Sequence, residues 1–219
     1  MKALLFPALL LASACSTDAS VEQQYLIRPD VLPDPVEIAT TAPRVTLARP
    51  QVAEHIEGLT LVRLDGRVDH LHYSRFAAPV PEIVGEWMTS LLTASGKVRW
   101  ALPAGLASSA DFALQLRVMR FELEEVAPAA GGLRAEVLLE AVLLHGKTSE
   151  VLATRRARGG LVATGSTPAL LVESLREALR QASENLRDAL IPLLVIPPTP
   201  LTASNTLAPR SAPPVQPLP

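Results

Sequence analysis

The side chain most able to do chemistry in this sequence is its single cysteine, Cys15. It follows a positively charged Lys2, an apolar run over residues 3–11 that is too short to span a bilayer, and three small residues. This pattern is typical of a cleaved export signal. An exported chain with one thiol has no partner for an internal disulfide, so Cys15 is a candidate for covalent modification.

The residues Leu11-Ala12-Ser13-Ala14-Cys15 resemble the lipobox of bacterial lipoproteins. The resemblance implies that the Cys15 thiol is acylated, that the chain is cut just before it, and that the new amine is acylated too. Several acyl chains give stable anchoring, because each buried methylene contributes about 0.8 kcal/mol. Ser16, rather than an aspartate, would follow the cysteine, which by resemblance to the sorting rule of enteric-type bacteria implies the outer membrane.

The run Gly146-Lys147-Thr148 matches the end of a phosphate-binding loop. The first glycine of that motif would fall at position 141, which is Ala141. The motif should also open a helix, whereas residues 149–157 have the pattern of a strand. We therefore expect no nucleotide site here.

His70 and His72 lie two residues apart beside Asp69, a spacing that puts both imidazoles on one face of a strand. Such pairs can ligate zinc. A third ligand at useful spacing is missing from the sequence, and histidines on the surface of a hairpin account for the pair. The sequence therefore predicts no metal site.

No nucleophilic site is predicted either, because the sequence has no Gly-x-Ser-x-Gly motif and Cys15 is assigned to the anchor. We interpret the cluster Arg155, Arg156 and Arg158 as a solvated strand end rather than an anion site. None of the candidate residues therefore forms a predicted catalytic site. We expect a protein that is not an enzyme and that uses no cofactor.

Composition narrows the class of protein further. The chain has 219 residues and a formal net charge of -2, with basic and acidic residues interspersed. That is no electrostatic footprint for nucleic acid. The length accommodates one domain of ordinary size between two ends that lack apolar patterning.

Short apolar or alternating runs predict strands at residues 25–28, 44–47, 51–56, 59–63, 68–76, 98–102, 111–126, 133–144 and 151–158. The apolar phase of residues 111–126 shifts between Val118 and Met119, which predicts a bulge near Val118. Residues 133–144 are apolar on one face and partly on the other, which suits a central strand.

Two segments have the period of an amphipathic helix. One runs from Glu82 to about Gly96, after prolines that favour a helix start. The other begins at Thr167-Pro168, with threonine as the cap, and is expected to stop at Pro192. Residues 192–219 hold nine prolines and predict a disordered tail, with a spacer that touches peptidoglycan or a partner as the alternative.

Three runs in this order resemble the auxiliary lipoproteins of ABC-type, Mce-associated intermembrane transport systems. They are Arg49-Pro50-Gln51-Val52, Leu71-His72-Tyr73-Ser74-Arg75-Phe76-Ala77-Ala78-Pro79-Val80 and Leu116-Arg117-Val118-Met119-Arg120-Phe121-Glu122. Phe76 stands where that family typically has a tryptophan. The similarity covers about residues 25–190.

The resemblance implies an α/β fold: a single domain with a mixed, mostly antiparallel sheet and two main helices packed against it. It divides the chain into a signal peptide (1–14), a tether (15–24), the auxiliary domain (25–191) and a disordered Pro-rich tail (192–219).

The resemblance also implies a function. The protein would sit at the periplasmic face of the outer membrane, lipid-anchored through Cys15, and dock a substrate-binding Mce-domain protein of a system with an ABC permease and ATPase that moves lipid. A homo-oligomer is possible in that family. Two alternatives stay open: an outer-membrane lipoprotein that assembles a barrel or secretin, and a periplasmic metalloenzyme that uses His70 and His72.

Overall fold

The computed structural model describes residues 23–29, 41–53, 56, 59–64, 67–106, 109–126 and 132–194. For residues 59–61, 63–64 and 68–74 it describes the backbone only. The predictions for the signal peptide, Cys15, most of the tether and residues 195–219 lie outside the described residues.

The long strands form an antiparallel meander at the centre of the fold. β7 (Phe112–Glu125) pairs with β8 (Leu133–His145), and β8 pairs with β9 (Val151–Val162). The predicted bulge is confirmed, because the register of β7 against β8 shifts between Val118 and Arg120. The bulge leaves Met119 41% exposed and returns Phe121 to the buried face, so one face of β7 stays apolar along its length.

Short parallel strands cover the other edge of β7. β2 (Arg44–Leu47), β3 (Gln51–Val52) and β4 (Leu59–Leu64) pair with it in succession. β6 (Trp100–Pro103) adds to β2, β5 (Arg67–Phe76) pairs antiparallel with β4, and β1 (Gln23–Tyr25) adds to β5. The described strands thus form one nine-stranded mixed sheet. The expected α/β class is confirmed, with β8 as a central strand.

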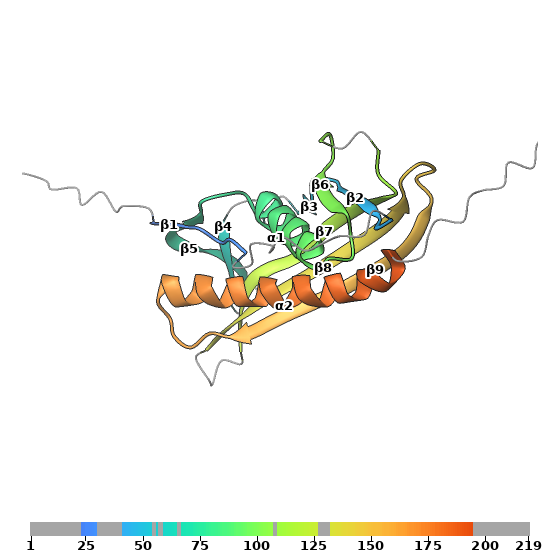
Figure 1. Ribbon diagram of the computed structural model, residues 1–219. Helices are drawn as coiled ribbons and strands as arrows, with labels where there is room; N and C mark the ends of the chain where they lie inside the picture. Colours follow the sequence, from blue (N-terminus) through green and yellow to red (C-terminus); the bar gives the residue numbers. More distant parts are fainter. Residues whose placement is uncertain are drawn as a thin grey trace, which may run out of the picture.

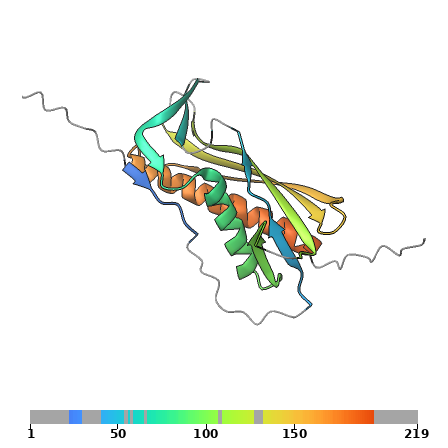
Figure 2. The same cartoon turned by 90° about the horizontal axis from the view of Figure 1, so that it is seen from above.

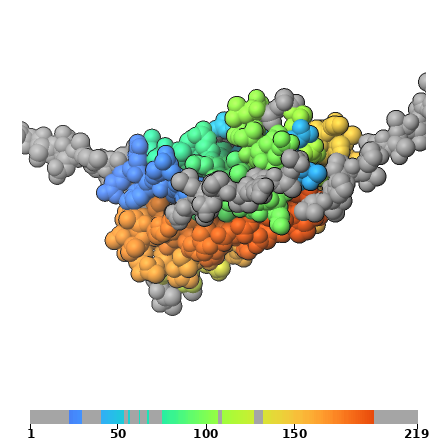
Figure 3. Space-filling view, viewed as in Figure 1, coloured from blue at the N-terminus to red at the C-terminus, as the bar shows by residue number. Residues whose placement is uncertain are grey.

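Both helices, α1 (Val80–Ala94) and α2 (Pro168–Leu194), cover the same face of the sheet (Figures 1 and 2). Their apolar stripes pack against the buried residues of β7 and β8, and this layer is the hydrophobic core. α2 runs along the length of the domain below α1 and β6 (Figure 3).

The backbone of α2 closely approaches the sheet at Gly159 of β9. A Cβ added there would collide with the carbonyl oxygen of Ala178 and approach the backbone nitrogen of Ala182 to 2.7 Å. Only glycine permits this contact between helix and strand backbones. Ala178 and Ala182 are fully buried, so small residues on both elements bring the helix down onto the strand.

Pro192 does not end the second helix as expected: α2 continues to Leu194 with Pro192 inside it. Proline removes one backbone donor and disfavours a helix interior, but only the last turn follows it here. Leu190 and Leu194 are both buried, so packing of this turn offsets the missing bond.

Several predicted strand bounds are also wrong. The strand expected over residues 51–56 ends at Val52, and the one expected from Val98 begins at Trp100. β1 stops at Tyr25, although Ile27 is buried in the core. β9 continues past Arg158 to Val162, because Gly159 and Gly160 stay paired with β8.

A candidate docking groove beside the first helix

A groove of about 410 Å³ lies between α1 and the segments that follow β2 and β6. One wall is a side of α1 formed by residues between Pro81 and Ser90. The other is formed by residues 47–50 and by Pro103 and Ala104. The residues that line it are Leu47, Ala48, Arg49, Pro50, Pro81, Glu82, Gly85, Glu86, Thr89, Ser90, Pro103 and Ala104.

Backbone hydrogen bonds fix the strand wall of the groove to the sheet. The Ala48 amide donates to the Leu114 carbonyl at 2.9 Å, and the Ala104 amide donates to the Leu47 carbonyl at 2.7 Å. Pro50 then turns the chain toward α1 and is buried. The groove therefore has a rigid strand wall rather than a free loop.

On the helix wall, α1 begins after Pro79, and its early proline, Pro81, is buried. Gly85 faces Pro50: a Cβ at Gly85 would lie 3.5 Å from the Pro50 Cδ atom, which is ordinary van der Waals contact. The missing side chain leaves room at this point of the groove. The helix wall and the strand wall therefore come close at Gly85 and Pro50 without closing the groove.

The groove is apolar inside and charged at its margins. Glu82 and Glu86 are exposed on α1 and four residues apart, so they lie on one side of the helix. Arg49 is exposed on the strand wall. Such a surface suits an extended apolar segment that carries a cation toward the α1 side.

The sequence-derived site residues are not gathered in this groove. Cys15 lies outside the described residues. His70 and His72 are placed in β5, but their side chains are outside the description. Among the described residues, no group of three or more His, Cys, Asp or Glu side chains could hold a metal ion.

The Gly-Lys-Thr run forms the turn between β8 and β9 and not the start of a helix, so the phosphate-loop reading is excluded. His145 Nδ1 accepts hydrogen bonds from the Lys147 and Thr148 amides, both at 3.3 Å. A Cβ at Gly146 would collide with the Ala110 carbonyl oxygen. This glycine serves the close approach of two chain segments.

Two arginines of the cluster on β9 form ion pairs, although their side chains stay 68% and 54% exposed. Arg158 Nη2 donates to Glu136 Oε2, and Arg156 Nε donates to Glu140 Oε2, each at 2.6 Å. Both carboxylates lie on β8, and the Glu136 side chain is only 3% exposed. Arg120 of β7 also donates to Glu136, at 3.1 Å. Arginines from both neighbouring strands thus neutralise the buried Glu136.

Two of the family-like runs meet in the core. Phe76, at the end of β5, packs edge-on against Phe121 of β7 with ring centroids 5.4 Å apart and an interplanar angle of 88°. Both rings are buried. The aromatic position of the second run therefore supports the fold.

The first run, Arg49 to Val52, behaves differently, because Arg49 and Pro50 line the groove. The family resemblance included this run without a role for it, and no sequence motif pointed to Glu82, Gly85 or Glu86 as site residues. The sequence did contain a usable signal, because each wall has a proline next to an exposed charged residue: Arg49-Pro50 and Pro81-Glu82. The spacing of Glu82 and Glu86 also placed them together on one side of a predicted helix.

The elements define a two-layer α/β domain with an apolar groove beside α1. The chain belongs to the family of ABC-type transport auxiliary lipoprotein components, whose family model matches residues 25–186. The expected family is thereby confirmed at this level. No helix among the described residues is long and apolar enough to cross a membrane.

Solved structures share the fold. A protein of Xanthomonas campestris from the DUF330 family is 22% identical, with a TM-score of 0.68, over 77% of this chain and 94% of that chain. An uncharacterized protein is 15% identical, with a TM-score of 0.54, over 67% of this chain and 92% of that chain. No curated protein matches the chain significantly.

Proposed function

We propose that this protein is the non-catalytic docking component of an Mce-type ABC system that transports lipid between membranes. It is held at the periplasmic face of the outer membrane by acyl chains on Cys15. The match to the auxiliary lipoprotein family over residues 25–186 carries the proposal. The export signal and lipobox-like residues before Cys15 support the anchor.

In this proposal the groove beside α1 receives a segment of the Mce-domain protein. Its walls offer apolar surface from three prolines and several aliphatic residues, and Glu82 and Glu86 add negative charge. Apolar contact would supply affinity, and the carboxylates would select a segment with a basic residue. The energy for transport would come from the ATPase, so this subunit needs no catalytic group.

Affinity purification from crosslinked envelopes tests the partner. The full-length protein should recover an Mce-domain protein and its permease. Glu86→Arg should reduce that recovery, because it reverses a charge at the groove. Glu150→Arg is the matched control, since Glu150 is exposed at the β8–β9 turn away from the groove. Recovery of only a barrel or a secretin would overturn the proposal and favour an assembly role.

Fractionation of the envelope tests the anchor. The wild-type protein should incorporate labelled palmitate and sediment with the outer membrane, whereas Cys15→Ala should do neither. Inner-membrane sedimentation of the labelled protein would contradict the location while leaving the anchor intact. Absence of label on the wild type would contradict the anchor itself.

A further inference from the structure

A segment of the same chain has a composition that suits the apolar groove beside α1. Residues 195–219 follow α2, and among them only Arg210 is charged. Their prolines are Pro197, Pro198, Pro200, Pro209, Pro213, Pro214, Pro217 and Pro219. Proline-rich segments favour the extended polyproline II conformation, which lies readily in an apolar groove at small entropic cost.

The charges of the segment and the groove are complementary. Arg210 lies directly after Pro209 and three residues before Pro213. On the groove, Glu82 and Glu86 form an acidic side of α1, while Arg49 lies on the strand wall. A cation entering the groove is therefore drawn toward α1 and away from the strand wall.

The position of the C-terminal end of α2 allows the segment that follows it to reach the groove. In both ribbon views the C-terminal end of α2 lies at the same end of the domain as β2 and β6, whose following residues form the strand wall (Figures 1 and 2). Leu194 is 2% exposed, so this end of the helix is fixed to the core. From there, residues 195–210 extend to about 50 Å in polyproline II geometry, more than enough to reach α1.

We propose that residues 195–219 bind the groove of their own chain, with Arg210 beside Glu82 and Glu86 and the neighbouring prolines against Pro50, Pro81 and Pro103. Attachment to α2 gives the segment an effective concentration in the millimolar range. An intrinsic affinity that would be weak between separate molecules therefore keeps the groove covered in the free protein. Any partner that uses the groove has to displace this segment.

Disulfide trapping in the purified full chain tests the proposal. The Cys15→Ser background removes the native thiol, and Ser90→Cys in the groove is combined with Ser211→Cys next to Arg210. Both changes are nearly isosteric. The control pair is Thr154→Cys with Ser211→Cys, because Thr154 is exposed on β9 and does not line the groove. The groove pair should form an intramolecular disulfide about tenfold faster than the control pair.

A charge swap tests the role of Arg210. In the groove pair, Glu86→Arg should slow intramolecular trapping about two- to fivefold, and Arg210→Glu should do the same. Combining the two substitutions should restore the rate, because it recreates an opposite-charge pair. Glu150→Arg should leave the rate unchanged. Rescue by the double variant separates a charge contact from damage to the helix.

Equal trapping of the groove and control pairs would overturn the proposal, as would trapping between molecules only, which would assign the groove to a second copy. The measurement needs no transport partner. A negative trapping result would thus contradict the binding of residues 195–219 to the groove without contradicting the proposed function. Failure to recover an Mce-domain protein would contradict the proposed function without contradicting the trapping result.

Discussion

Arg44 and Asp111 join the start of β2 to the start of β7. The Arg44 Nε and Nη2 atoms donate to the two Asp111 carboxylate oxygens at 3.1 and 2.9 Å, and the Arg44 amide donates to Asp111 Oδ2 at 2.9 Å. The Asp111 amide returns a bond to the Arg44 carbonyl at 2.9 Å. The hydrogen bonds from Arg44 lower the pKa of Asp111. The pair fixes the base of the strand wall of the groove.

Asp111→Ala removes all three bonds from Arg44 to the carboxylate and should lower the free energy of unfolding by about 1 to 2 kcal/mol. Urea unfolding at neutral pH measures the change. Asp188→Ala is the control, because Asp188 is exposed on α2 and pairs only with the adjacent Arg187. An equal loss in both variants would show that the Arg44–Asp111 pair has no special role.

Glu177 makes the free energy of unfolding depend on pH. Hydrogen bonds from Arg180 are the main cause that lowers its pKa to about 2 from the ordinary 4.5. A lowered folded pKa adds stability that is fully present above pH 4.5 and is lost as the pH falls toward 2. Both side chains are partly exposed, so solvent screening limits the effect to under about 1 kcal/mol.

Glu177→Gln should therefore reduce stability at pH 6 but leave it nearly unchanged at pH 2, where the wild-type carboxylate is half protonated or more. Denaturant unfolding of both proteins across this range measures the difference. A constant gap between them at every pH would contradict the assigned pKa and leave only a packing effect.

At the scale of elements, the packing of α2 on β9 depends on Gly159. A methyl group there would push the backbone of α2 away from the strand, because its nearest neighbours are backbone atoms that cannot rotate aside. Gly159→Ala should cost about 3 kcal/mol of stability, at the high end for overpacking. Thermal and urea unfolding would show the loss.

Gly160→Ala provides the matched control in the adjacent position. Its added Cβ would first meet the Arg134 guanidinium, with Nη2 at 3.1 Å, and that side chain can move. The change should stay within about 0.5 kcal/mol. Similar costs for the two alanine variants would mean that strand propensity, and not contact with α2, governs both positions.

The elements that sequence patterns predicted well are those with long, regular apolar periods. The bulge near Val118, the central strand β8 and both helices follow from local periodicity, which the final packing preserves. The errors fall where long-range contacts decide. Pro192 stays helical because Leu194 packs in the core, and β9 runs through Gly159 and Gly160 because β8 and α2 hold them.

At the scale of the whole molecule, the candidate site was less predictable than the fold. The groove combines residues 47–50, 81–90 and 103–104. The pairing of β2 with β6 brings the first and last of these together, and the packing of α1 against β6 and β3 adds the helix. No local pattern encodes that juxtaposition. The family resemblance included Arg49 and Pro50, but it also included Phe76, which packs in the core. Resemblance alone does not distinguish a run that lines the groove from a run that supports the core.

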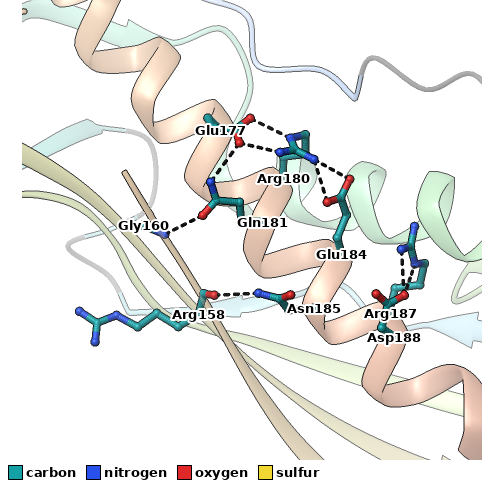
Figure 4. A network of polar contacts seen from close by, with 9 residues as sticks. All are labelled: Arg158, Gly160, Glu177, Arg180, Gln181, Glu184, Asn185, Arg187 and Asp188. Atoms are coloured by element: carbon teal, nitrogen blue, oxygen red, sulfur yellow. Dashed lines mark hydrogen bonds and ion pairs between the residues drawn. The ribbon is translucent and has the colours of Figure 1, made fainter. Parts of the chain in front are cut away.

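The outer edge of β9 pairs with no other described strand. Its backbone groups are covered by side chains at three points (Figure 4 shows two of them): Asn185 Nδ2 donates to the Arg158 carbonyl at 3.2 Å, and the Gly160 amide donates to Gln181 Oε1 at 3.4 Å. The third is Arg155 Nη1, which donates to the Thr154 carbonyl at 2.9 Å. A covered edge resists pairing with another chain.

The double variant Gln181→Ala with Asn185→Ala should expose two of these backbone groups to a second molecule. We expect concentration-dependent association or aggregation, measured by light scattering and sedimentation, with the free energy of unfolding lowered by about 1 kcal/mol. Glu173→Ala is the control on the same helix, because its exposed carboxylate pairs only within α2, with Arg176. If the double variant stays as monodisperse as the wild type while losing the two hydrogen bonds, the charges of Arg155 and Arg156 must protect the edge instead, and reversing them should then cause the association.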